Sequence, residues 1–111
     1  MTSQHDPQRR PTHPGAVLRE EILPPLGLTQ TELAKLLQVS RFSISDLLLE
    51  KRALSPAMAV RVASLLNTPP ETWLLMQQAL DLWELGQAAA QRNKVAPLPP
   101  ERLAALAARQ G

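Results

Sequence analysis

Three side chains in the segment RFSIS, and a basic pair shortly after it, are the residues of this chain best suited to recognition chemistry. Arg41 carries a guanidinium fork that can bond O6 and N7 of a guanine together, and the Ser45 hydroxyl can bond any base. The ring of Phe42 could pack on a thymine methyl. Lys51 and Arg52 supply the positive charge that neutralises backbone phosphates. These residue types therefore offer non-covalent recognition of double-stranded DNA.

Two short helices joined by a tight turn are predicted between residues 28 and 55, and they would position these side chains. Thr29 opens the first helix, and Glu32, three residues later, completes a capping box. Ser40 caps the second helix, which leaves only Gln38 and Val39 for the connection. A connection this short makes the helices cross steeply, as in a helix-turn-helix motif. Leu33, Leu36 and Leu37 form an apolar stripe at helical spacing in the first helix, and Ile44, Leu47 and Leu48 form the buried stripe of the second.

The face of the second helix opposite its apolar stripe would enter the major groove, with its N-terminal residues nearest the bases. This face carries Phe42, Ser45, Asp46 and Leu49, with Arg41 toward its edge. Three alternatives are open for Phe42, whose ring could pack on a thymine methyl, on a protein partner or against a neighbouring helix. The predicted DNA-contact set is Thr29, Gln30, Ser40, Arg41, Phe42, Ser45, Asp46, Lys51 and Arg52.

Four sequence blocks in this order resemble the HigA antitoxins, the VapI branch of the Cro/repressor-like (XRE) helix-turn-helix group. The blocks are HPGAVLREEIL (13–23), LTQTELAKLLQVSR (28–41), KRALSPAMAVRVASLL (51–66) and TPPETWLLMQ (68–77). Two positions depart from the family pattern: Leu49-Glu50 replaces an Asn-Gly type pair, and Asp46 replaces a neutral or basic residue. Both departures place an acidic group near the expected phosphate path.

The resemblance implies an all-α, lambda-repressor-like DNA-binding domain of five helices, followed by a short C-terminal helical tail. It also implies the antitoxin of a type II toxin–antitoxin system. Such a protein would neutralise a HigB/RelE-like mRNA-cleaving toxin and repress its own operon at an inverted-repeat operator. Two other interpretations stay open: a free-standing helix-turn-helix repressor without a toxin, and a protein-interaction module that has lost DNA binding.

The rest of the chain is also predicted to be helical. A first helix should start at Pro14 and stop at Pro24-Pro25, and Ser55-Pro56 should open another. Thr68 and Glu71 form a second capping-box pattern before the fifth helix. The predicted organisation is a flexible N-terminal arm (1–12), a DNA-binding and dimerisation domain (13–92), and a Pro-rich linker with a short helix (93–111).

The fifth helix carries more apolar surface than one face of a small domain needs. Part of this surface should face a second copy, and a two-fold dimer would place two recognition helices about one DNA turn apart. The predicted dimer residues are Trp73, Leu75, Met76, Leu80, Leu82 and Trp83.

Composition and charge narrow the function further. The 111-residue chain has no cysteine, a net charge of +2 and no apolar run long enough for a membrane span. Basic residues outnumber acidic ones from Lys35 to Arg61, whereas every charged residue between residues 62 and 91 is acidic. Neither His5 nor His13 has a carboxylate or serine in a recognisable catalytic arrangement with it, and both are expected at the surface. The sequence therefore predicts neither an enzyme nor a bound cofactor. The polar N-terminus contains no targeting segment, and the expected location is the cytoplasm, on the nucleoid when DNA is bound.

Overall fold

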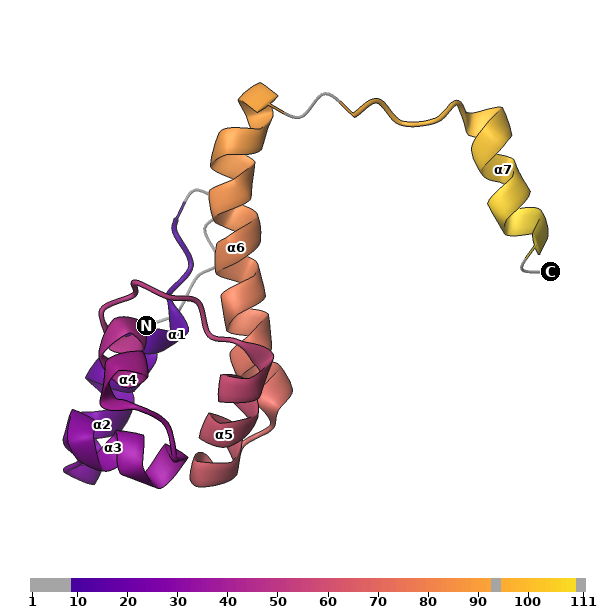
Figure 1. Cartoon of the computed structure of the whole chain (residues 1–111). Coiled ribbons are helices and arrows are strands. Elements are labelled where there is room, and N and C mark those ends of the chain that lie inside the picture. The colour runs from indigo at the N-terminus through magenta and orange to yellow at the C-terminus, as the bar shows by residue number, and fades with distance from the viewer. Residues whose placement is uncertain (1–8, 93–94, 110–111) are drawn as a thin grey trace.

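The computed structural model describes residues 9–92 and 95–109, with residues 87–92 as backbone only. Every regular element in these ranges is a helix, which confirms the all-α prediction (Figure 1). The elements are α1 (Pro14–Val17), η1 (Leu18–Ile22), α2 (Leu23–Leu26), α3 (Gln30–Leu37), α4 (Arg41–Leu48), α5 (Pro56–Leu66), α6 (Pro70–Arg92) and α7 (Pro100–Arg109). The segments α1, η1 and α2 are continuous and form one helix, the first helix. Over the described ranges the chain therefore forms the five main helices and the short C-terminal helix that the sequence predicts.

The first helix does not stop at Pro24-Pro25, and that prediction is wrong. A π-helical turn, η1, precedes the two prolines, and its Leu23 N–H bonds to the carbonyl of Leu18. The wider turn accommodates the proline rings and their missing N–H groups, which would break a regular helix. The helix ends instead at Gly27, whose φ of 64° is the left-handed conformation typical of a glycine C-cap.

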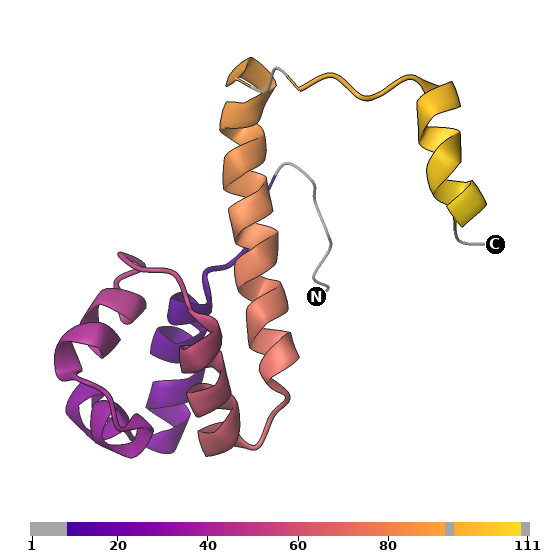
Figure 2. The same ribbon diagram turned by 45° about the vertical axis from the view of Figure 1, so that its right-hand side comes forward.

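A single core lies between the first helix, α3, α4, α5 and the first half of α6. Its most buried side chains come from all of these elements and include Leu18, Leu33, Ile44, Leu47, Leu48, Ala59, Val62 and Leu80. Helix α6 extends well beyond this core, and α7 stands apart from it (Figure 2). No helix within the described ranges combines the length and apolarity needed to cross a bilayer.

Local capping follows the sequence at three of the four predicted places. Thr29 and Glu32 form the expected capping box of α3, and Ser40 and Ser55 cap α4 and α5. Thr68 is used differently, because its hydroxyl accepts a hydrogen bond from the indole N–H of Trp73 at 2.9 Å. This bond fixes the Trp73 ring at the start of α6.

Candidate nucleic-acid interface

The turn between α3 and α4 has the compact geometry that the sequence predicts. Gln38 adopts a left-handed φ of 61°, and its N–H bonds to the carbonyls of Ala34 and Lys35. Val39 N–H also bonds to the Ala34 carbonyl at 3.0 Å. Because these bonds close the end of α3, the chain enters α4 within a few residues and in a new direction.

The outer face of α4 is open to solvent near its N-terminal end. Arg41, Phe42 and Ser45 line a shallow hollow of about 350 Å³ on this face. Phe42 is 79% exposed, so the alternative in which its ring packs against a neighbouring helix is wrong. The other two alternatives, a thymine methyl and a protein partner, both require such an exposed ring.

Three other polar residues of the predicted set lie at helix starts, and two of them, Thr29 and Ser40, already make local hydrogen bonds. The Thr29 hydroxyl accepts the N–H of Glu32 at 3.1 Å. Ser40 Oγ accepts the N–H of Ser43 at 3.0 Å and also bonds the Ser43 hydroxyl. Gln30 is half-buried at the first position of α3. Both capping hydroxyls therefore hold the motif together whether or not they also contact a ligand.

Asp46, one of the two acidic departures, is paired within the motif. Its carboxylate lies 3.6 Å from Nη2 of Arg52, and Arg52 Nη1 donates to the Ser43 hydroxyl at 3.4 Å. This pairing offsets the charge of Asp46 and draws one predicted phosphate ligand back onto α4. Lys51, by contrast, is exposed.

Glu50, the other departure, pairs through its carboxylate with two arginines nearer the N-terminus. The carboxylate oxygens lie 3.3 Å from Arg19 Nη1 and 3.4 Å from Arg10 Nη1. Arg10 also reaches Glu84 of α6 at 3.1 Å, so this end of the predicted arm contacts the domain. Residues 1–8, the rest of that arm, lie outside the described residues. The backbone of Glu50 has φ 62°, a conformation that suits the glycine of an Asn-Gly pair.

Both motif helices are held at their C-terminal ends by guanidinium groups from outside the motif. Arg19 Nη1 donates to the carbonyl of Leu48 at 2.6 Å, and Arg61 Nη1 donates to the carbonyl of Leu37 at 2.8 Å. Each bond satisfies an orphan carbonyl at the negative end of a helix dipole. Hydrogen bonds to Glu20 and Glu50 raise the pKa of the Arg19 guanidinium. Arg61 belongs to the basic region identified in the sequence. In the fold its guanidinium is partly engaged in a hydrogen bond to the C-terminal end of α3.

The first helix approaches α4 most closely at Gly15. A Cβ built on Gly15 would lie 1.9 Å from the carbonyl oxygen of Leu47, so only glycine fits against this backbone. His13 is buried beside it, contrary to the expectation of a surface position, and its Nδ1 accepts the N–H of Gly15 at 2.9 Å as the helix cap. His5 lies outside the described residues.

Sequence reasoning missed Gly15, Arg19 and one further positioning residue, Gln77 of α6. The buried Gln77 accepts the N–H of Leu54 at 2.8 Å and donates to Asp81 at 2.8 Å, which ties the loop before α5 to α6. Only Gly15 leaves a signal in the sequence, because a glycine inside a helix is costly without a packing reason.

The predicted dimer residues divide into two groups. Trp73 and Leu80 are only 4% and 1% exposed, because they pack into the protomer's own core, and Met76 is partly buried against it. Leu75 and Leu82 are more than 60% exposed, and Trp83 is half-buried. The surface left for a second copy is therefore narrower than the six residues predicted and lies on the outward side of α6.

Comparison with known proteins identifies the motif. The family described as "Helix-turn-helix" matches residues 18–73, from the π-helical turn to the start of α6. The chain belongs to this helix-turn-helix family. Among curated relatives, it is 47% identical over 77 residues to the uncharacterized HTH-type transcriptional regulator YbaQ of Escherichia coli K12, and the match covers 69% of this chain and 68% of that one.

Solved structures agree with the resemblance to HigA. The antitoxin GraA matches with a TM-score of 0.76 and 36% identity over 81% of this chain and 99% of GraA. The Pseudomonas aeruginosa antitoxin HigA, solved with the higBA promoter, matches with a TM-score of 0.74 and 30% identity over 81% of this chain and all of that one. The chain is thus a member of a regulator family rather than an enzyme family, and it resembles the HigA antitoxins in sequence and fold.

Proposed function

We propose that this protein is a HigA-type antitoxin that represses its own operon by binding an inverted-repeat operator as a homodimer. The observation that carries this proposal is the exposed outer face of α4, where Arg41, Phe42 and Ser45 line an open hollow. The P. aeruginosa HigA, a relative of the same fold, was solved with promoter DNA.

In this proposal α4 lies in the major groove. Arg41 would bond a guanine edge, Ser45 a neighbouring base, and Phe42 a thymine methyl. Gln30, at the N-terminus of α3, would also lie at the groove, and Lys51 would contact phosphate. Arg52 would bind a phosphate only after its ion pair with Asp46 breaks. Its contribution to DNA affinity is therefore smaller than that of Lys51.

A binding assay on the DNA upstream of this protein's own gene tests the DNA assignment. Fluorescence anisotropy would compare this DNA with a scrambled duplex for the wild type, Arg41→Ala and Arg41→Lys. Arg41→Lys is the matched control, because it keeps the charge and loses the bidentate fork. We expect both variants to lose preference for the operator and Arg41→Lys to keep more of the non-specific affinity. An unchanged preference in both variants would exclude Arg41 as a base reader.

The toxin half of the proposal rests on the HigA resemblance and on charge. An mRNA-cleaving toxin must be basic to hold its substrate, and opposite charges steer association. Three acidic residues, Glu71, Asp81 and Glu84, are exposed on α6. Within the protomer, Asp81 bonds Gln77 and Glu84 bonds Arg10.

Co-expression with the adjacent small open reading frame tests this half. We expect growth arrest from the neighbour alone, relief when this protein is present, and co-purification of the two proteins. If the neighbour is harmless or does not co-purify, the free-standing repressor becomes the better account, and the DNA result is unaffected.

A further inference from the structure

The C-terminal helix α7 has an apolar face with nothing packed on it in the protomer. Leu103 and Leu106 lie on this face, and every described residue of α7 is exposed. A helix of ten residues is marginal in water on its own, because nucleation is costly and few backbone bonds follow. Its strong separation of apolar and charged residues indicates that it forms against another surface.

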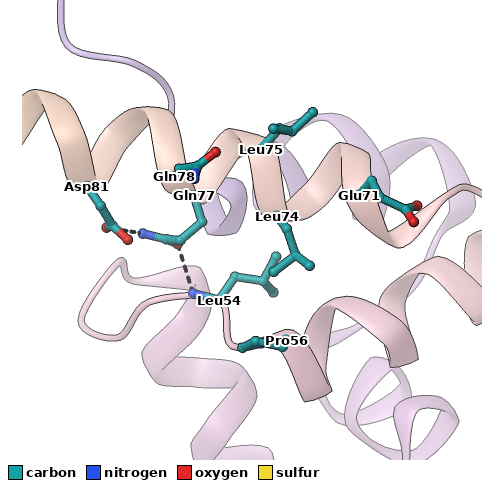
Figure 3. A pocket seen from close by; sticks show the side chains of 8 residues that line it. All are labelled: Leu54, Pro56, Glu71, Leu74, Leu75, Gln77, Gln78 and Asp81. Atoms are coloured by element: carbon teal, nitrogen blue, oxygen red, sulfur yellow. Dashed lines mark hydrogen bonds between the residues drawn. The ribbon is translucent and has the colours of Figure 1, made fainter. Parts of the chain in front are cut away.

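A groove of matching character lies between the start of α5 and the first half of α6 (Figure 3). Its volume is about 390 Å³. Leu54, Pro56 and Leu74 face its middle, and Glu71 and Asp81 lie toward its two ends (Figure 3). The Gln77–Leu54 hydrogen bond fixes one wall, so the groove is built before any ligand arrives.

Charges on α7 and on the groove are complementary. Arg102 and Arg109 lie two turns apart on one edge of the apolar face, about 10 Å along the helix axis. The two groove carboxylates, Glu71 and Asp81, lie about 15 Å apart along α6 by the same rise per residue. Long arginine side chains can close this difference, while Leu103 and Leu106 would fill the apolar middle.

We propose that α7 docks in the α5–α6 groove of a second copy of this chain, and that the exchange is reciprocal. The connection over residues 95–99 is extended, contains Pro97 and Pro99, and leads α7 away from α6 in both views (Figures 1 and 2). Proline-rich segments act as semi-rigid spacers, so they favour reaching another molecule over folding back. This proposal rests on the homodimer of the proposed function. In that dimer, α7 of each copy covers part of α6 of the other.

Thiol cross-linking tests the proposal directly, because the chain has no cysteine of its own. The full-length variant Gln78→Cys/Ala107→Cys places one thiol beside the groove and one on α7. With a short bismaleimide reagent we expect a covalent dimer on a denaturing gel, and also from a mixture of the two single variants. The matched control replaces Gln78→Cys by Ser64→Cys, an exposed position of α5 that lines a different hollow, and should give little dimer.

A variant of α7 and a measurement of molecular mass distinguish docking on a second copy from the alternatives. Leu103→Glu, an exposed position that the fold does not need, should lower the yield of cross-linked dimer at least fivefold if α7 docks by its apolar face. Thiol consumption at monomer mass would mean that α7 folds back on its own groove, which overturns exchange. Light scattering separates the two proposals: a dimer mass without cross-linking would overturn α7 docking but keep the homodimer, and a monomer mass would overturn both.

Discussion

Replacing Gly15 by alanine is the sharpest test of how α4 is positioned. The added Cβ would lie 1.9 Å from the carbonyl oxygen and 2.8 Å from the carbonyl carbon of Leu47, and 3.1 Å from Nδ1 of His13. The nearest atoms belong to backbone, so no side-chain rotation relieves the clash, and the first helix and α4 must separate. Overpacking of this kind typically costs about 1 to 3 kcal/mol.

The stability lost through this clash is partly offset by the higher helix propensity of alanine. Alanine is favoured over glycine inside a helix by roughly 0.5 to 1 kcal/mol, so a neutral site would become more stable. Gly86 is such a site, because it lies in α6 with nothing within 4 Å of its built Cβ. We therefore expect Gly15→Ala to lower the free energy of unfolding by about 2 kcal/mol and Gly86→Ala to raise it by up to about 1 kcal/mol.

Urea unfolding followed by circular dichroism measures both variants under the same conditions. The unfolding midpoint should fall for Gly15→Ala and stay level or rise for Gly86→Ala, with unchanged slopes. DNA affinity of the folded Gly15→Ala protein should also fall, because α4 moves relative to α3. If Gly15→Ala is as stable as Gly86→Ala, the close approach of the first helix to α4 is wrong.

Three further substitutions probe the charges around the recognition helix. Lys51→Ala should weaken binding to all duplexes alike and reduce the salt slope by about one unit, which a titration at several salt concentrations measures; an effect confined to the operator would instead make Lys51 a base reader. Asp46→Asn should tighten binding to every duplex, because it removes a repulsive charge and releases Arg52 for phosphate, whereas loss at a single base pair in a competition assay would indicate direct readout of cytosine. Glu50→Gly should leave the urea midpoint unchanged or raise it. Glycine adopts the left-handed backbone conformation of this position without strain, and this gain outweighs the loss of ion pairs that solvent screens. A clear drop in the midpoint would show that the ion pairs with Arg19 and Arg10 dominate.

The parts of the fold that sequence predicts are those decided within a few residues. Thr29 and Ser40 cap their helices through bonds to residues three positions ahead, and the spacing of apolar residues sets which face of α4 is buried. The positions that escaped prediction depend on distant backbone groups. Arg19 bonds a carbonyl 29 residues away, and Gln77 bonds an N–H 23 residues away, so neither has a local pattern.

The first helix illustrates a different limit. Two adjacent prolines ordinarily end a helix, and no local pattern around Pro24-Pro25 predicts otherwise. The π-helical turn before Leu23 changes the hydrogen-bond register, and the prolines then fall at the second and third residues of α2, within its first turn, where a missing N–H group is tolerated. Leu18 and Leu23, at the two ends of this turn, both belong to the core, so the turn is coupled to packing against distant segments that no local pattern reveals.

The acidic departures from the family pattern illustrate how placement changes the meaning of a charge. In the linear sequence, Asp46 and Glu50 weaken the basic character of the region that should meet DNA. In the fold, Glu50 pairs with Arg19 and Arg10, and Asp46 pairs with Arg52, so both charges are offset within the protomer. The same Arg19 also holds the last carbonyl of α4, so the compensation of Glu50 and the positioning of the recognition helix share one guanidinium. A change at Arg19 should therefore uncover the charge of Glu50 and loosen α4 together, which links the electrostatics of the proposed DNA face to its geometry.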